Sequence, residues 1–303
     1  MNETKIPFNR LNDVYVKALL GDENKKNLTL DFINSTLERT GDRAFTDLQF
    51  INKEQEPPFE HGKVTILDIL AEMNDGSKVD IEIQVARHDF LKERSLYYWA
   101  RMYASELHQG DAYRFLKPTI SIVLLGFNGA FKSPDYHHAY AIQDIKTHER
   151  LTEQLEMHFV ELEKVRISDI KKVKRKDTWF LYFSPKCTEA ERKELAMKNN
   201  AIKKAIDYED LFHGNKNLWY AYEQNEKAIR DYNSLMDTSR REGLEEGRKE
   251  GRAEGETIGE QRAAVSFALS LLEDKTPLAK IIQWTKLSEK EIRRIAKKHG
   301  LEI

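Results

Sequence analysis

Apolar residues recur with two different periods along this chain. Residues 13–21 and 25–38 repeat them at helical spacing, which predicts two amphipathic helices. The next segments are short, rich in β-branched and large apolar residues, and mostly bounded by Gly, Pro, Asn or Asp. These predicted strands are residues 45–52, 64–72, 78–85 and 119–127. Residues 88–109, before the last strand, carry a helical apolar face, and a strand, a long helix and a buried strand predict a βαβ crossover in an α/β fold.

The second half of the chain changes from strands to helices. Residues 139–145 and 155–162 are expected to be two further strands of the sheet, and helices follow from about residue 179 to 237. Glycine then recurs every fourth residue among Glu, Arg and Lys, at Gly243, Gly247, Gly251, Gly255 and Gly259. Because a glycine costs a helix roughly 1 kcal/mol relative to alanine, this stretch is either a frayed charged linker or a helix packed closely against a partner helix.

The C-terminal end has its own helical pattern. Residues 263–272 and 278–284 carry apolar stripes, and Ser288 with Glu291 forms the capping box of a last helix that ends at Gly300. The last two helices fit either a helix-turn-helix or, because their turn lacks glycine, an oligomerisation or specificity module. The predicted organisation is an α/β core over residues 1–165, a helical extension over 166–237, a charged glycine-periodic connector over 238–262 and a small helical unit over 263–303.

Composition narrows the class of protein. The 303 residues include 49 Lys and Arg against 51 Asp and Glu, so any contact with nucleic acid must use local basic patches. The densest basic run, residues 171–176, is either such a patch or a solvated loop. The single cysteine, Cys187, excludes an intrachain disulfide and a cysteine-based zinc site and predicts a cytoplasmic protein. No membrane partner is expected, because the longest apolar run, residues 120–127, is too short for a span and the polar residues 1–12 lack the apolar core of a signal peptide.

The most informative segment is residues 65–85, two β-type runs around Asn74-Asp75-Gly76. A three-residue hairpin loop needs a left-handed residue at its third position, where Gly76 stands. This loop pairs Leu70 with Asp80 and places Asp68 opposite Glu82, with Cβ atoms about 4.5–5.5 Å apart. Alternation puts Leu67, Ile69, Ala71, Val79, Ile81, Ile83 and Val85 on one face and Asp68, Asp80, Glu82 and Gln84 on the other.

Two carboxylates this close repel each other unless a cation or a shared proton lies between them. Hard oxygen ligands suit Mg²⁺ or Mn²⁺, which take one or two protein carboxylates and complete their shell with water and substrate phosphate. Such an ion makes bound water more acidic and stabilises charge on a phosphate under attack. Asp68 and Glu82 are therefore candidate metal ligands of a site that hydrolyses phosphodiesters. The alternative is an ordinary solvated sheet surface.

These residues also carry a resemblance to a known family. Asp68, followed by Glu82-Ile83-Gln84 on the next strand, resembles the PD-(D/E)xK nuclease core in an E-x-Q form. More narrowly, the chain resembles the Rpn family of recombination-promoting nucleases, also described as transposases. Further matching segments are Asp13-Val14-Tyr15-Val16-Lys17, Phe32-Ile33-Asn34, Leu67-Asp68-Ile69-Leu70-Ala71, Arg94, Tyr97-Tyr98, Arg101-Met102-Tyr103, Gly110, Tyr113, Leu116-Lys117-Pro118 and the glycine-periodic tail.

The resemblance implies a restriction-endonuclease-like mixed sheet flanked by helices, with a helical C-terminal extension. It implies a Mg²⁺-dependent DNA endonuclease with a part in DNA recombination, in which Asp68 and Glu82 are catalytic metal ligands and Mn²⁺ is the alternative ion. Gln84, the third catalytic residue, stands where the commoner motif has lysine, and a neutral amide can only position water or phosphate, which leaves the general base open. The alternative is a catalytically inactive DNA-binding or phage-defence interaction protein that keeps the nuclease fold.

Several basic and aromatic residues are candidate DNA contacts. Arg94, Tyr98 and Arg101 can share one helical face, so they are either phosphate contacts above the site or solvated positions of an amphipathic helix. Lys17, four residues after Asp13, either approaches the metal site or forms a weak surface pair with that aspartate. DNA is the expected partner, and a homodimer is expected because a dimer can cut both strands.

Overall fold

The structure, a computed structural model, describes residues 8–51, 54–55, 65–107, 110–166 and 170–301. The chain divides into two compact units, Met1–Asp231 and Tyr232–Ile303. Parts of the sequence-based predictions lie outside the described residues. They are residues 1–7 of the polar segment, the end of a strand at residue 52, the start of a strand at residue 64, the end of a helix at residues 108–109, residues 167–169 of the helical extension and residues 302–303 of the C-terminal unit.

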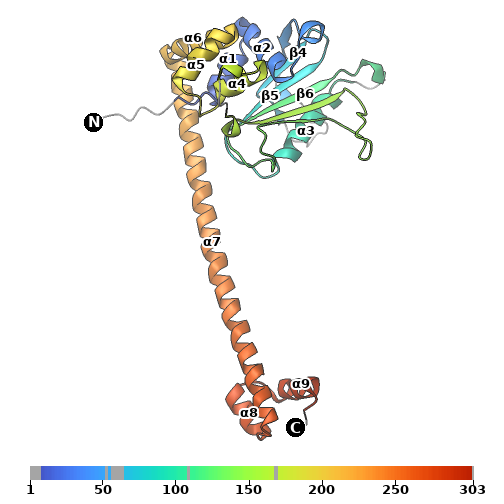
Figure 1. Cartoon of the computed structure of the whole chain (residues 1–303), viewed down its shortest axis with the longest axis vertical. Coiled ribbons are helices and arrows are strands. Elements are labelled where there is room, and N and C mark those ends of the chain that lie inside the picture. Colours follow the sequence, from blue (N-terminus) through green and yellow to red (C-terminus); the bar gives the residue numbers. More distant parts are fainter. Residues whose placement is uncertain (1–7, 52–53, 56–64, 108–109, 167–169, 302–303) are drawn as a thin grey trace, which may run out of the picture. The chain divides into compact units, whose positions relative to one another are not determined.

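A six-stranded mixed sheet is the centre of the first unit (Figure 1). Its order is β1-β4-β5-β6-β8-β7, and the central strands β5, β6 and β8 run parallel. The strands are β1 (Leu48–Phe50), β4 (Ile69–Met73), β5 (Lys78–Gln84), β6 (Thr119–Leu125), β7 (His137–Tyr140) and β8 (Leu155–Glu161), and β2 (Glu54–Gln55) pairs separately with β3 (Thr65–Ile66). Every residue of β6 is buried, as expected of a parallel strand covered on both faces. The predicted βαβ crossover is confirmed, because α3 (Leu91–Ala104) connects β5 to the parallel strand β6.

Three predicted strands differ from the structure. Of the predicted strand over residues 45–52, only Leu48–Phe50 form a strand, β1. The predicted strand over residues 64–72 is interrupted by a bend at Leu67 and Asp68, which separates β3 from β4. The bend turns Leu67 into a small cluster with Leu70 and Met102, so the prediction that it shares a face with Ile69 was wrong. The predicted strand over residues 139–145 was also wrong in extent, because β7 begins at residue 137 and ends at residue 140.

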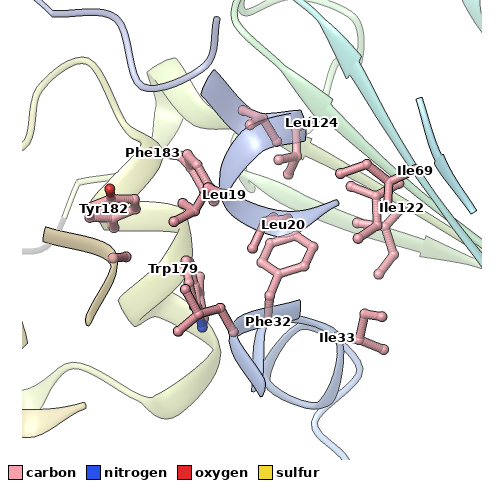
Figure 2. Close-up of a cluster of buried hydrophobic side chains, with 14 of the residues drawn as sticks. Leu19, Leu20, Phe32, Ile33, Ile69, Ile122, Leu124, Trp179, Tyr182 and Phe183 are labelled. Atoms are coloured by element: carbon pink, nitrogen blue, oxygen red, sulfur yellow. The ribbon is translucent and has the colours of Figure 1, made fainter. Parts of the chain in front are cut away.

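Helices before and after the sheet in sequence cover one of its faces. The helices are α1 (Asp13–Leu20), α2 (Lys26–Thr36), α4 (Arg175–Phe183), α5 (Glu189–Lys198) and α6 (Asn200–Gly214). Figure 2 shows Leu19 and Leu20 of α1 lying between strand residues and aromatic residues of α4. The strand residues are Ile69, Ile122 and Leu124, and the aromatic residues are Trp179, Tyr182 and Phe183. The helical extension therefore shares one hydrophobic core with the sheet.

The start of α1 is fixed locally, which matters for the site because this helix carries Lys17. The Asn12 side chain accepts a hydrogen bond from the Val14 N–H at 3.0 Å and so caps the helix. The helix ends at Gly21, where a Cβ atom would lie 2.7 Å from the Lys17 carbonyl oxygen. Four residues of α1 are buried against the core, and Lys17 of the same helix contacts Asp68, just before β4.

α3 covers the opposite face of the sheet. Leu91 and Trp99 pack with apolar residues of β6 and β8, and the Trp99 Nε1–H donates to the Thr119 carbonyl at 2.7 Å. The helix is shorter than the predicted residues 88–109, because Phe90 adopts a left-handed conformation with φ 61° and α3 begins after it. Short 3₁₀ turns complete the unit at Glu23–Lys25, Gly41–Arg43, Tyr113–Phe115, Leu162–Lys164 and Ile170–Lys172.

The second unit consists of helices. α7 (Lys216–Glu273) includes all five periodic glycines, so the predicted connector is helical throughout. A Cβ atom added at any of these glycines would meet nothing within 4 Å, so no partner helix in the described chain packs on them. α8 (Leu278–Thr285) and α9 (Glu289–His299) follow, and both bonds of the predicted Ser288–Glu291 capping box are confirmed. Among the described helices, α7 included, none has an apolar stretch of the length that a bilayer requires.

Candidate active site

The hairpin of β4 and β5 brings the two predicted metal ligands together. Leu70 lies opposite Asp80, which confirms the predicted register, and Gly76 has the expected positive φ of 84°. Two residues beyond this pair on each arm of the hairpin, the Asp68 N–H donates to the Glu82 carboxylate at 3.2 Å. The Asp68 carboxylate in turn accepts from the Ile83 N–H at 2.8 Å. Asp68 and Glu82 are therefore direct neighbours, although Asp68 lies in the bend just before β4 rather than within the strand.

Asp80 is a third carboxylate that sequence reasoning did not assign to the site. It lies two residues before Glu82 on β5, so both side chains are on the same face of the strand. Asp80 is fully buried, one of its oxygens accepts from the Ser121 hydroxyl at 3.3 Å, and the other has no hydrogen-bond partner. The alternating Asp80-x-Glu82-x-Gln84 pattern was the signal that could have identified it.

Asp68, Asp80 and Glu82 form the acidic group of the site, and burial and mutual repulsion raise the pKa values of Asp80 and Glu82. Burial, and then the charge of Asp68, raise the pKa of Glu82 to about 8. Burial, followed by the charges of Glu82 and Asp68, also raises the pKa of Asp80 well above its usual range. Both shifts favour the protonated carboxyl, and a bound divalent cation would oppose them by favouring the carboxylate.

Two cations from different helices lie at the site, one paired with Asp68 and the other with Gln84. Lys17 of α1 lies 2.8 Å from the Asp68 carboxylate and 2.8 Å from that of Asp13, so it pairs with Asp13 and also reaches a predicted metal ligand. Burial lowers the pKa of Lys17, but the two carboxylates outweigh burial and raise it above its ordinary value. Arg94 of α3 donates to the side-chain oxygen of Gln84, at the end of β5. The position next to the acidic residues that lysine fills in the commoner motif is therefore occupied by a glutamine held by arginine.

The other two predicted contacts on α3 differ in their surroundings. The Arg94 guanidinium lies 5.9 Å from the centre of the Tyr98 ring. Burial raises the pKa of Tyr98, and the charges of Glu82, Asp68 and Asp80 raise it further, which places this phenol in the field of the acidic group. Arg101 is only 9% exposed, and its guanidinium lies 5.9 Å from the centre of the Tyr97 ring. Little of Arg101 is thus available to a DNA backbone.

The basic run at residues 171–176 is partly engaged in the fold. Arg175 forms an ion pair with Asp31 at 2.8 Å, and Lys176 forms one with Glu38 at 2.9 Å. Both acidic partners lie on or just after α2, so these contacts attach α4 to α2. The ion pairs favour a structural role for this end of the run.

The oxygen atoms of the acidic group are chemically suited to a divalent ion. Asp68 and Glu82 offer carboxylate oxygens, which are the ligands that Mg²⁺ and Mn²⁺ prefer. The unpartnered oxygen of buried Asp80 lies on the same strand face. No group of three or more His, Cys, Asp and Glu side chains in the described parts of the chain could hold a metal ion. The residues fit an ion that keeps open positions for water and phosphate, not one caged by protein.

Fold and site together define an α/β domain of the restriction-endonuclease-like class: a mixed sheet flanked by helices, with paired acidic residues on a hairpin next to the crossover helix. The chain belongs to the family described as PD-(D/E)XK nuclease family transposase, whose sequence model matches residues 10–239. This membership supports a nuclease-like function, and nucleases of this type typically use divalent metals. No curated protein and no solved structure matches the chain.

Proposed function

We propose that this protein is a Mg²⁺-dependent DNA endonuclease whose catalytic residues are Asp68, Glu82 and Gln84. The observation that carries the proposal is the hydrogen bond from the Asp68 backbone N–H to the Glu82 carboxylate, 3.2 Å long. It makes these two acidic residues direct neighbours. Mg²⁺, with Mn²⁺ as the alternative, would be held by Asp68 and Glu82 and would supply Lewis acidity at the phosphate and acidify a water molecule.

The remaining residues have separate roles in this proposal. Gln84 accepts from Arg94 through its oxygen, which leaves its amide NH₂ to donate to a phosphate or to the attacking water. Lys17 stays protonated because its pKa is raised, so it acts as a cation near the phosphate rather than as a general base. Tyr98 and Arg94 form the α3 side of the DNA contact, whereas the buried Arg101 packs near the Tyr97 ring and has a structural role.

Plasmid nicking by the full-length protein tests the proposal. The parent protein is expected to nick supercoiled DNA with Mg²⁺ and to lose this activity in EDTA. Asp68→Asn and Glu82→Gln should reduce the rate at least about 100-fold, because each removes a charged ligand. Glu72→Gln on the same hairpin is the matched control, since Glu72 is exposed and lies outside the acidic group. Nicking that survives Asp68→Asn would reject the site.

A catalytically inactive DNA-binding or phage-defence interaction protein is the second candidate. The observation in its favour is that Lys17 and the Ile83 N–H already satisfy the Asp68 carboxylate. DNA binding by a parent protein that does not nick with Mg²⁺ or Mn²⁺ would support it. A role in recombination, action in the cytoplasm and a homodimer that cuts both strands belong to the first proposal, and sedimentation of the protein with and without DNA tests the dimer.

A further inference from the structure

The C-terminal helices carry a concentration of positive charge that the active site does not use. Residues 264–301 contain eight Lys and Arg but only four acidic residues, in a chain whose net charge is −2. The basic residues are Lys275, Lys280, Lys286, Lys290, Arg293, Arg294, Lys297 and Lys298. This segment lies beyond residues 10–239, the part matched by the family. Nothing in the nuclease proposal accounts for it.

The same helices form a core of their own. The last turns of α7 contribute Ala268, Leu271 and Leu272, α8 contributes Ile281, and α9 contributes Ile292, Ile295 and Ala296 to one buried cluster. Figure 1 shows these three helices gathered at the C-terminal end of the chain. The end of α7 and the two short helices α8 and α9 thus share one core, which holds α9 in a fixed position relative to the other two.

The connection between α8 and α9 has the geometry of a helix-turn-helix. Only Lys286, Leu287 and Ser288 separate the two helices, and a turn of three or four residues is typical of this motif. The turn lacks glycine, but Lys286 adopts the left-handed conformation that glycine would provide, with φ 58°. Leu287 is buried in the cluster, and Ser288 caps α9. The missing glycine is therefore no argument against the motif.

α9 separates its charges from its apolar residues completely. Its apolar residues Ile292, Ile295 and Ala296 are buried, whereas the exposed side consists of charged residues and one histidine: Glu289, Lys290, Arg293, Arg294, Lys297, Lys298 and His299. Lys290, Arg294 and Lys298 follow at intervals of four and form a row about 12 Å long. The major groove of DNA is about 12 Å wide and admits a helix.

We propose that residues 264–301 form a helix-turn-helix module that places α9 against the major groove of duplex DNA, with Arg294 and Lys298 contacting phosphates. The exposed side of α9 lacks the apolar centre typical of a protein–protein interface. An amphipathic helix on a membrane would need its apolar face free, and here that face is buried. A rigid, purely charged ridge fits the DNA backbone best of the three partners.

Binding of the full-length protein to DNA in EDTA tests the module without cleavage. The probe is a fluorescein-labelled 20-base-pair duplex, followed by anisotropy between 50 and 200 mM salt. The double variant Arg294→Gln/Lys298→Gln should bind roughly tenfold or more weakly, and the slope of log K against log salt should become about 2 less steep. Arg240→Gln/Arg248→Gln is the matched control, because both arginines are exposed on α7 and the loss of charge is equal.

Three outcomes would overturn the proposal: an unchanged slope in the first variant, an equal loss in the control, or parent protein that binds anionic phosphatidylserine vesicles or an acidic protein but not the duplex. Since Arg294 and Lys298 are exposed, the fold should persist, and circular dichroism checks this. If the double variant unfolds, Lys298→Gln alone should still reduce the slope by about 1. Because binding is measured in EDTA, where no cleavage occurs, the result does not depend on whether the proposed nuclease site is active.

Discussion

Glu82 is a nearly buried glutamate that touches another acidic residue. Burial and Asp68 raise its pKa to about 8, against an ordinary 4.5, so the folded protein keeps a proton that the unfolded chain releases between these values. The ionisation of Glu82 should therefore lower the free energy of unfolding of the metal-free protein as pH rises from about 4.5 to 8.

Glu82→Gln tests this ionisation directly. The glutamine oxygen can still accept from the Asp68 N–H, but it has no proton to lose. The variant should gain stability over the parent as pH rises, up to a few kcal/mol at pH 8. Urea unfolding in EDTA at pH 5, 6, 7 and 8 measures the difference. Two stability curves that stay parallel across this range would contradict the raised pKa.

Lys17 acts on the same carboxyl group from α1. Its charge lowers the pKa of Glu82, opposing the larger effects of burial and Asp68. Lys17→Gln should therefore move the acidic limb of the pH–activity profile upward, by up to about one unit. Lys26→Gln on α2 is the control, because Lys26 pairs with Glu23 rather than with the site. A profile that does not move would exclude Lys17 from the electrostatics of the site.

The sequence predicted that Asp68 and Glu82 are neighbours, but not which other side chains contact them. Counting from the Gly76 turn was sufficient to put Asp68 beside Glu82, because hairpin geometry is local. The contact of Lys17 with Asp68 joins residues 51 positions apart and depends on how α1 packs on the sheet, so sequence left two readings open. The surroundings of Asp80 depend in the same way on β6, whose Ser121 donates to one of its oxygens and leaves the other without a partner.

The hairpin that carries the site depends on one glycine. Gly76 has φ 84°, and a Cβ atom there would lie 3.2 Å from the Lys117 side chain. Gly76→Ala should lower the free energy of unfolding by about 1–3 kcal/mol, mostly through backbone strain. Gly214→Ala should be close to neutral, because its φ is ordinary and nothing lies near the added atom. Urea unfolding of both variants checks the prediction, and equal effects would contradict it.

For the glycines of α7 we expect the opposite effect, a gain in stability on substitution by alanine. Gly247, Gly251 and Gly255 are helical, and an added Cβ atom would meet nothing within 4 Å. Alanine at each position should stabilise the helix by roughly 1 kcal/mol and slow amide hydrogen exchange around it. If a second copy of the chain packs on this face in solution, the same changes should instead weaken the dimer. Hydrogen exchange and sedimentation of the triple alanine variant separate the two cases.

Helices and strands were predicted correctly where the spacing of apolar residues is uninterrupted, and their ends were misplaced where the backbone bends. α1, β5, β6 and α9 follow a single period and were confirmed. The break at Leu67 and Asp68 lies inside an apolar run that reads as one strand, because apolar residues continue on both sides of it. The left-handed Phe90 shortens α3 in the same way, since no glycine or proline marks the position.

At the scale of the whole molecule, α7 runs from one compact unit into the other. Its middle, from residue 239 to 263, is exposed throughout, whereas each unit has a buried cluster of its own. A protease needs local unfolding, which is least costly where a helix lacks tertiary contacts and contains glycine. Brief trypsin treatment should therefore cut first within the predicted connector, residues 238–262.

The expected products are two folded fragments, one with the sheet and one with α8 and α9, identified by mass spectrometry. Lys203 and Lys204 on α6 provide an internal control, because these lysines are exposed but their helix is fixed to the core by Ile202 and Ala205. Cleavage there before cleavage in α7 would contradict the prediction. The triple alanine variant should be cut more slowly than the parent, since each added methyl group makes opening of α7 more costly.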